Sequence, residues 1–293
     1  MRSMTLLSYA KVNLFLTIDA RRADGYHDLT LINSRFSLAD RIEIAWRDEA
    51  GIALQCSDPS VPCDGRNTAH QAAQRFLHAA GMEAGVKITI AKRIPHGAGL
   101  GGGSSNAAAV LRGLNRLLGD PLGESELARL AVPIGADVPF FLHGGLCLLR
   151  GIGDQIEPIG LPAEAQASTV HLVLCSPAAH VSTGQAYRLW DDSNRPPGAS
   201  AQPLVRALQA GDWARALEHT HNDFEAVIFE AFPALGAAYD CFASVSPTPP
   251  RLSGSGSNLF GLYVDQNHAI NVHDHLTRQG YAAAMHRLLV DAG

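Results

Sequence analysis

The chain has 293 residues, of which 46% are hydrophobic and 17% charged, and its formal net charge is −5. The apolar fraction excludes a disordered chain, and the length allows one large domain or two of ordinary size. An acidic chain with few charges lacks the basic field that broad binding to DNA or RNA needs. An anionic ligand would therefore need a local site that does not depend on many Lys and Arg side chains.

The five cysteines are irregularly spaced and form no CxxC pair, which favours free thiols in a reducing cytoplasm over disulfides or a zinc site. The N-terminus lacks the small-residue cleavage site of a signal peptide, and Lys11 and Asn13 interrupt its apolar stretch. No window of about 18 residues is apolar throughout. We therefore expect a cytoplasmic protein with no membrane span.

The first half of the chain alternates between strand and helix patterns. Alternating apolar side chains predict strands at residues 9–18, 41–46, 51–55 and 86–90. Amphipathic spacing predicts helices at residues 68–80, 104–118 and 125–131. Asn67 is the expected N-cap of the first helix, and Gly81 ends it. Lys11 and Asn13 share one face of the first strand, because side chains two positions apart point the same way.

The second half has weaker patterns. It predicts strands at residues 171–175 and 259–264, and helices at residues 183–189, 203–210, 212–218, 233–242 and 268–279. Residues 191–203 contain Pro, Gly, Ser and Asp in a cluster that is typical of a flexible connection. The mixture gives an α+β or α/β chain with a domain boundary near residue 158.

A glycine-rich loop lies between the strand at 86–90 and the helix at 104–118. Five of the 28 glycines fall within residues 97–103. Glycine lets a ligand approach the main chain closely, and the N–H groups at a helix start attract an anion without side-chain charge. Ser104 and Ser105 could cap the helix, donate to phosphate or bind Mg²⁺. The alternative is a flexible turn with an ordinary N-cap.

The loop does not match two common nucleotide motifs. It lacks the Gly-Lys-Ser/Thr of a Walker loop. Gly97, Gly99 and Gly102 form a GxGxxG, but a dinucleotide fold also needs an acidic residue about 20 positions later, at the end of a strand. Here that distance falls in the turn at residues 119–123, which disfavours a dinucleotide oxidoreductase.

Several segments together are more specific than the loop alone. They are Ala10-Lys-Val-Asn13, Asp24-Gly-Tyr-His27, Gly99-Leu-Gly-Gly-Gly-Ser-Ser-Asn-Ala-Ala108, Ile134-Gly-Ala-Asp-Val-Pro-Phe-Phe141, His221-Asn-Asp-Phe-Glu225 and Leu252-Ser-Gly-Ser-Gly-Ser257. In order and spacing they resemble the motifs of the GHMP kinase superfamily. The resemblance covers nearly the whole chain and is closest to the branch that phosphorylates a cytidine-diphosphate-linked methylerythritol.

This resemblance implies an α+β fold of two domains, an ATP-binding domain at 1–158 and a second domain at 159–293, with the active site in the cleft between them. It implies ATP-dependent phosphorylation of the 2-hydroxyl of the cytidine-linked substrate, a step of the non-mevalonate isoprenoid pathway. The ATP site would comprise Asn67, Pro95, Gly97, Gly99, Leu100, Gly101, Gly102, Gly103, Ser104 and Ser105. Mg²⁺ would be held by a loop serine and ATP oxygens, with no dedicated set of protein ligands.

The resemblance assigns catalysis to Lys11 and Asp137. We expect Asp137 to accept the hydroxyl proton, and Lys11 to orient the carboxylate and the hydroxyl and keep the carboxylate ionised. Read without the resemblance, Lys11 could be an edge lysine that reaches solvent, and Asp137 a helix N-cap. An N-cap could still present its carboxylate to a cleft.

The substrate contacts implied by the resemblance are Asn13, Tyr26, His27 and Tyr187. Tyr26 and Tyr187 would stack on cytosine, and neutral His27 can donate to and accept from its edge. The alternatives are a loop aromatic that covers the core and an ordinary buried helix residue. Asn33 departs from the family pattern, in which an apolar or aromatic side chain often lines the pocket at this position.

Two other functions stay open. One is a different GHMP kinase, such as one acting on mevalonate or homoserine, and the other is a catalytically inactive binding protein of the same fold. Ser253–Ser257 is either a support near the phosphates or a plain turn. We expect small-molecule ligands, no nucleic acid, no membrane partner, and a monomer or homodimer.

Overall fold

The computed structural model describes residues 3–196 and 198–291. Its strands are β1 (Ser3–Arg21), β2 (His27–Arg47), β3 (Gly51–Cys56), β4 (Gly85–Ala91), β5 (Leu146–Arg150), β6 (Gln155–Pro158), β7 (His171–Ser176), β8 (His221–Asn222), β9 (Arg251–Leu252), β10 (Leu259–Tyr263) and β11 (Ala282–Leu289). Its helices are α1 (Thr68–Ala79), α2 (Gly102–Leu117), α3 (Glu124–Ala131), α4 (Val138–His143), α5 (Ala163–Ala167), α6 (Thr183–Ser193), α7 (Gln202–Gln209), α8 (Trp213–Glu218), α9 (Glu225–Ala231), α10 (Pro233–Ala243) and α11 (Gln266–Arg278).

The chain forms two compact units that exchange segments several times. The first unit holds the chain up to Ala10, then Leu38–His96 and Gly101–His143. The second holds Lys11–Ser37, Gly97–Leu100 and the chain from Gly144 onward. The long strands β1 and β2 and the glycine-rich loop each contribute residues to both units. The domain boundary near residue 158 stays a prediction.

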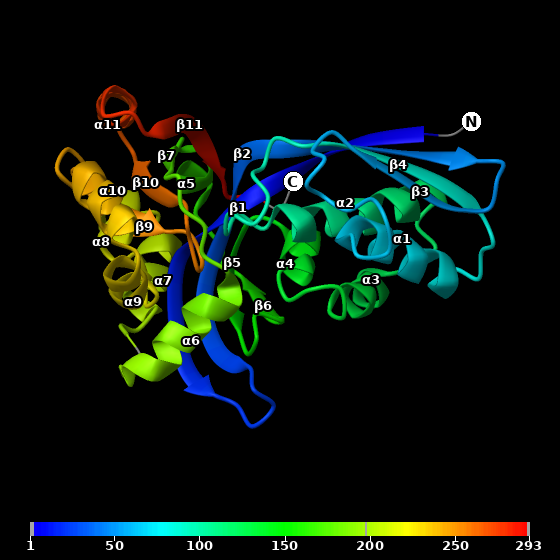
Figure 1. Ribbon diagram of the computed structural model, residues 1–293, viewed down its shortest axis with the longest axis horizontal. Coiled ribbons are helices and arrows are strands. Elements are labelled where there is room, and N and C mark those ends of the chain that lie inside the picture. Colours follow the sequence, from blue (N-terminus) through cyan, green and yellow to red (C-terminus); the bar gives the residue numbers. More distant parts are fainter. Residues whose placement is uncertain (1–2, 197, 292–293) are drawn as a thin grey trace. The chain divides into compact units, whose positions relative to one another are not determined.

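The first unit is built on β4, whose alternating Val86, Ile88 and Ile90 are buried. β3 pairs with β4 in parallel, and the second half of β2 pairs with it antiparallel. Helices α1 to α4 lie on one side of β2 and β4 (Figure 1). Gly113 of α2 permits close packing, because a Cβ there would lie 2.5 Å from Ile44 Cδ1.

The second unit is built on β7, which pairs antiparallel with β10 on one side and β11 on the other. β11 continues to the first half of β2, with Leu288 opposite Phe36. The same half of β2 also pairs with β5, through residues 31–34. α11 packs on β7, β10 and β11 through Ala269, Val272 and Leu276, which are spaced as one face of a helix.

The predicted helices and strands are present, most within two residues of their expected ends, whereas several elements were missed. The first half of β2 was missed because the buried polar run Asn33–Arg35 breaks the alternation. β5 was missed because both of its faces are apolar, a pattern without a period of two. The other missed elements are β6, β8, β9, β11, α4, α5 and α9. The flexible segment expected at 191–203 is wrong at both ends, since 191–193 belong to α6 and 202–203 to α7.

Two further features concern the chemistry of the chain as a whole. All five cysteines lie in the described ranges and are free thiols. Burial raises the pKa of Cys147 to about 11 and that of Cys175 to about 12. Among the helices described, none alone is long and apolar enough to cross a membrane, and α9 and α10 meet that criterion only as a pair bent by 118°.

Candidate active site

The first part of the glycine-rich loop, Gly97–Leu100, is pinned within the second unit. The N–H of Lys11 donates to Leu100 O at 3.0 Å, and Asn258 Nδ2 donates to Ala98 O at 2.8 Å. Gly99 has a φ of +75°, and a Cβ on it would lie 2.4 Å from a backbone oxygen of Ser253. Only glycine fits this position, because both the backbone angle and the space exclude a side chain. The loop is therefore held in one shape by its own unit.

The second part of the loop begins α2 in the first unit. Gly101 is the N-cap with a left-handed φ of 69°, and α2 starts at Gly102, two residues earlier than predicted. The expectation that Ser104 or Ser105 caps the helix is therefore wrong. The first turn carries no charge, and the first N–H groups of a helix have no acceptor within it. This helix start can bind an anion through its main chain.

The two serines of that first turn differ in their surroundings. Ser105 is buried, and its Oγ accepts a hydrogen bond from Ser8 Oγ at 2.7 Å. Ser104 is half-buried. Between the two hydroxyls, that of Ser104 is the one that a ligand or Mg²⁺ can reach.

A buried carboxylate, missed in the sequence, fixes the segment that enters the loop. Asp40 is 0% exposed and accepts from Lys92 Nζ at 2.5 Å, from the N–H groups of Arg93 and Ile94, and from Asn106 Nδ2. These bonds tie the end of β4 to the first turns of α2. Lys92 Nζ lies 3.2 Å from where a Cβ on Gly102 would be, so its ion pair with Asp40 lies against the start of α2.

Asp137 lies directly before α4 and is half-buried. The turn that leads to it approaches α2, since a Cβ on Gly135 would lie 3.7 Å from Ser104 Oγ. α1 also begins here, because Thr68 Oγ1 donates to Gly103 O at 2.7 Å. The first unit thus brings the turn that leads to Asp137 close to the helix start that can bind phosphate. Asn67 caps α1 as predicted, accepting from Ala69 N at 2.9 Å.

Lys11 and Asn13 lie side by side on β1, as their spacing predicts. Lys11 is only 5% exposed, which excludes an edge lysine that reaches solvent. Its Nζ donates to Asn13 Oδ1 at 2.8 Å. The second Gly/Ser loop lies against both, because a Cβ on Gly254 would be 3.3 Å from Asn13 Oδ1 and 3.8 Å from Lys11 Nζ. Ser253–Ser257 is therefore a buried support for these side chains and not a plain surface turn.

The structure also brings His27 and Tyr187 together from opposite halves of the sequence. Their rings stack at 4.7 Å with an interplanar angle of 15°. His27 Nε2 lies 2.7 Å from Asp191 Oδ1, a carboxylate that the sequence placed in a flexible segment. Tyr26 is 62% exposed and free to contact a ligand with its ring. A separation of 4.7 Å leaves no room for a base between His27 and Tyr187, so any stacked base lies outside this pair.

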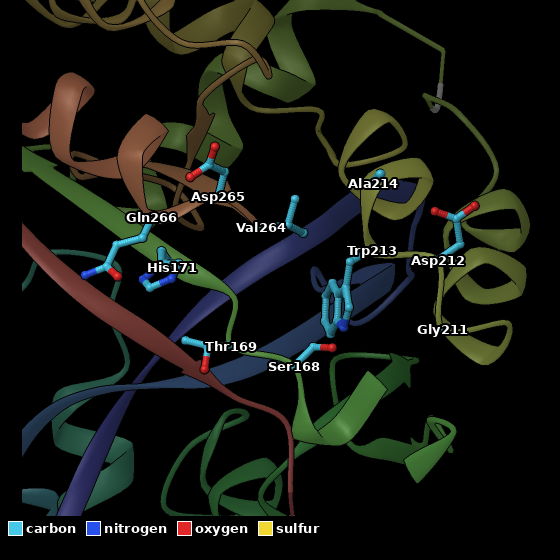
Figure 2. A pocket seen from close by; sticks show the side chains of 10 residues that line it. All are labelled: Ser168, Thr169, His171, Gly211, Asp212, Trp213, Ala214, Val264, Asp265 and Gln266. Atoms are coloured by element: carbon cyan, nitrogen blue, oxygen red, sulfur yellow. The ribbon is translucent and has the colours of Figure 1, made fainter. Parts of the chain in front are cut away.

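A hollow elsewhere in the second unit is lined by none of the predicted site residues. It has a volume of about 730 Å³, and Figure 2 shows His171, Trp213 and Asp265 among its lining side chains. Asp212 and Asp265 are the N-caps of α8 and α11, which accounts for the acidic groups at its rim. Within residues 3–196 and 198–291, no group of three or more His, Cys, Asp or Glu side chains is placed to hold a metal ion.

Comparisons with known proteins agree with the motifs. Residues 67–145 match the family "GHMP kinases N terminal domain", and residues 204–282 match "GHMP kinases C terminal". A protein of Geobacter sp. (strain M21) called 4-diphosphocytidyl-2-C-methyl-D-erythritol kinase is 39% identical, over 97% of this chain and 99% of its own. A protein of Prosthecochloris aestuarii with the same name is 37% identical over 92% of both chains.

Solved structures give the same result. A crystal structure of 4-(cytidine 5'-diphospho)-2C-methyl-D-erythritol kinase superimposes with a TM-score of 0.80, at 37% identity over 97% of this chain and 99% of the other. A homoserine kinase from Cytophaga hutchinsonii shares the fold, with a TM-score of 0.76 at 19% identity. The chain belongs to the GHMP kinase superfamily and, within it, to the family of the 4-diphosphocytidyl-2-C-methyl-D-erythritol kinases.

Proposed function

We propose that the chain transfers the γ-phosphoryl group of ATP to the 2-hydroxyl of 4-diphosphocytidyl-2-C-methyl-D-erythritol, a cytoplasmic step of the non-mevalonate isoprenoid pathway. The observation that carries the proposal is the buried Lys11–Asn13 pair, whose side chains lie against the Ser253–Ser257 loop while the Lys11 N–H donates to Leu100 O of the glycine-rich loop. A buried ammonium beside a loop shaped for an anion suits phosphoryl transfer, which depends on positioning and charge stabilisation. Relatives of 34–39% identity that carry this enzyme's name support the substrate.

ATP is assigned to the glycine-rich loop. The N–H groups at the start of α2 supply positive potential without adding to the net charge of the chain. The donor set also fits Mg²⁺, which prefers oxygen ligands and keeps several waters, because Ser104 offers an accessible hydroxyl next to the phosphates. When bound, Mg²⁺ would neutralise charge on the phosphate oxygens.

Asp137 and Lys11 carry the chemistry in this proposal. The acceptor hydroxyl gives its proton to the Asp137 carboxylate, and its oxygen bonds to the γ-phosphorus of ATP. The bond from that phosphorus to the bridging oxygen breaks and leaves ADP. Lys11 orients the hydroxyl, and the amide of Asn13 holds the ammonium in place.

The cytosine is assigned to the region around His27. A carboxylate only accepts, so the contact with Asp191 requires a His27 proton on Nε2, and in the neutral ring Nδ1 is then an acceptor. An acceptor matches the exocyclic amine of cytosine. Tyr26 has an exposed ring for stacking, and the stacked Tyr187 and His27 form a rigid aromatic wall.

A coupled assay for ADP tests the proposal. The purified chain is incubated with ATP and Mg²⁺, and separately with the cytidine-linked substrate, mevalonate or homoserine. We expect ADP release only with the cytidine-linked alcohol. Stimulation by mevalonate or homoserine alone would replace the proposed substrate, and binding of the cytidine-linked alcohol without ADP release would identify a binding protein.

A further inference from the structure

Three buried polar side chains, those of Lys11, Asn13 and Asn33, form a hydrogen-bonded relay that ends on β2. Lys11 Nζ donates to Asn13 Oδ1 at 2.8 Å, and Asn13 Nδ2 donates to Asn33 Oδ1 at 2.6 Å. Asn33 is 0% exposed and lies opposite Cys147 of β5. All three side chains belong to the second unit. The relay therefore exists within one compact body of the protein.

The donors and acceptors of this relay fix its direction. A lysine ammonium only donates, so Asn13 must turn its oxygen toward Lys11 and its NH₂ group away from it. Asn33 supplies the acceptor on that far side. With both ends held, the amide of Asn13 has one orientation, and the oxygen that receives Lys11 has one position.

Asn33 itself is not fully satisfied. Its Nδ2 is buried, and no hydrogen-bond partner is found for it among the residues that the structure describes. An unpartnered N–H group in a protein interior is unfavourable, and an apolar side chain would avoid it in the middle of a strand. An asparagine kept only for packing or stability would therefore be a poor choice at this position.

We propose that Asn33 is a positioning residue for phosphoryl transfer, which sets the Lys11 ammonium through the amide of Asn13. This inference rests on the proposed function, since it assigns Asn33 a role in the step that Lys11 supports. Asn33 touches neither the phosphates nor the acceptor hydroxyl in this role. Its effect is on kcat, because a misplaced ammonium weakens stabilisation of the transition state more than it weakens binding of either substrate.

The test compares Asn33→Val, Asn13→Ala and the double variant with the unmodified chain. In Asn33→Val the unpartnered N–H of Asn33 disappears while Asn13 Nδ2 loses its acceptor, so the melting temperature should change little. We expect kcat to fall about tenfold, the size of a coupling between residues in one hydrogen-bond network, with the KM for ATP within about twofold. Since Asn33 acts through Asn13, adding Asn33→Val to Asn13→Ala should lower kcat by less than about threefold further.

Ser34→Ala is the matched control, because Ser34 is the next residue on β2, is equally buried and donates to the backbone of Leu289. It should lower the melting temperature without changing kcat. The inference is overturned if Asn33→Val keeps kcat within about twofold, or if the losses multiply fully in the double variant. Failure of the unmodified chain to release ADP would instead reject the proposed function, so the two failures are distinguishable.

Discussion

Asp40 is the buried anchor of the segment that enters the glycine-rich loop, and its replacement by alanine should destabilise the chain strongly. Its carboxylate accepts from Lys92 Nζ, from two backbone N–H groups and from Asn106 Nδ2. In Asp40→Ala all four donors lose this acceptor. The Lys92 side chain is only 8% exposed and would be left as an uncompensated buried charge.

The size of the expected loss of stability follows from these hydrogen-bond partners. Removing one member of a buried ion pair lowers the free energy of unfolding by about 3–5 kcal/mol. In a chain of this size about 1 kcal/mol corresponds to roughly 2–3 °C, so the melting temperature should fall by roughly 6–15 °C. Asp40→Asn keeps one oxygen as acceptor and should lose less stability, but it should raise the KM for ATP because the loop entry is no longer held by charge.

Thermal and urea unfolding measure the effect, with the KM for ATP from the coupled assay. Asp64→Ala is the control, because Asp64 pairs with Arg66 through two exposed side chains and such pairs contribute little. It should leave the melting temperature within about 2 °C of the original value. If Asp40→Ala shifted the melting temperature no more than this control, Asp40 would not be the anchor described.

Three further outcomes follow from other parts of the structure. Gly99→Ala should lower the free energy of unfolding measured in urea by about 2 kcal/mol or more, because the new Cβ would combine a left-handed φ with a position 2.4 Å from a carbonyl oxygen. Gly25→Ala, which has open space at its Cβ, should lower it by only about 1 kcal/mol. Equal losses in the two variants would contradict the close approach at Gly99. Asp191→Asn should raise the KM for the cytidine-linked substrate on the order of tenfold with little change in kcat, since it no longer fixes the His27 tautomer, and an unchanged KM would remove this region from the cytosine site. Burial raises the pKa of Cys175 to about 12, so mass spectrometry at pH 8 should find the exposed Cys63 alkylated well before Cys175. The stability that the protonated Cys175 thiol contributes should be lost as the pH rises from about 9, the ordinary thiol value, toward 12. Early alkylation of Cys175 in the folded chain would refute its burial.

The parts of the site that follow local rules were predictable from the sequence. Lys11 and Asn13 share a face because strands have a period of two, and the helix after the glycine-rich loop is regular enough to be recognised. The predicted N-cap of that helix was wrong, because the N-cap is Gly101, in a left-handed conformation, and the two serines lie inside the helix. Glycine also occurs at N-caps, and it adopts the left-handed conformation readily.

The parts that depend on tertiary contacts were not predictable. Asp40 meets Lys92 and Asn106 across 52 and 66 positions of the chain, and no periodicity marks such a pairing. His27 meets Asp191 across 164 positions in the same way. The polar side chain of Asn33 interrupts the apolar pattern of β2, so the sequence did not predict the first half of this strand. Asn33 is also the residue that accepts the hydrogen bond from Asn13 in the relay.

The low charge of the chain is consistent with this site. Under the proposed function the phosphates bind N–H groups at the start of α2, where the first turn carries no charged side chain. Main-chain donors and a helix dipole attract an anion without raising the net charge of −5. A kinase of this design needs few surface cations.

The kcat of Asp137→Asn tests the central claim most directly. The measurement uses saturating ATP, Mg²⁺ and cytidine-linked substrate, with the melting temperature recorded beside it. Loss of the proton acceptor should lower kcat by about 10²–10⁴-fold while the chain stays folded. Turnover close to that of the unmodified chain would contradict the assignment of Asp137 as the base.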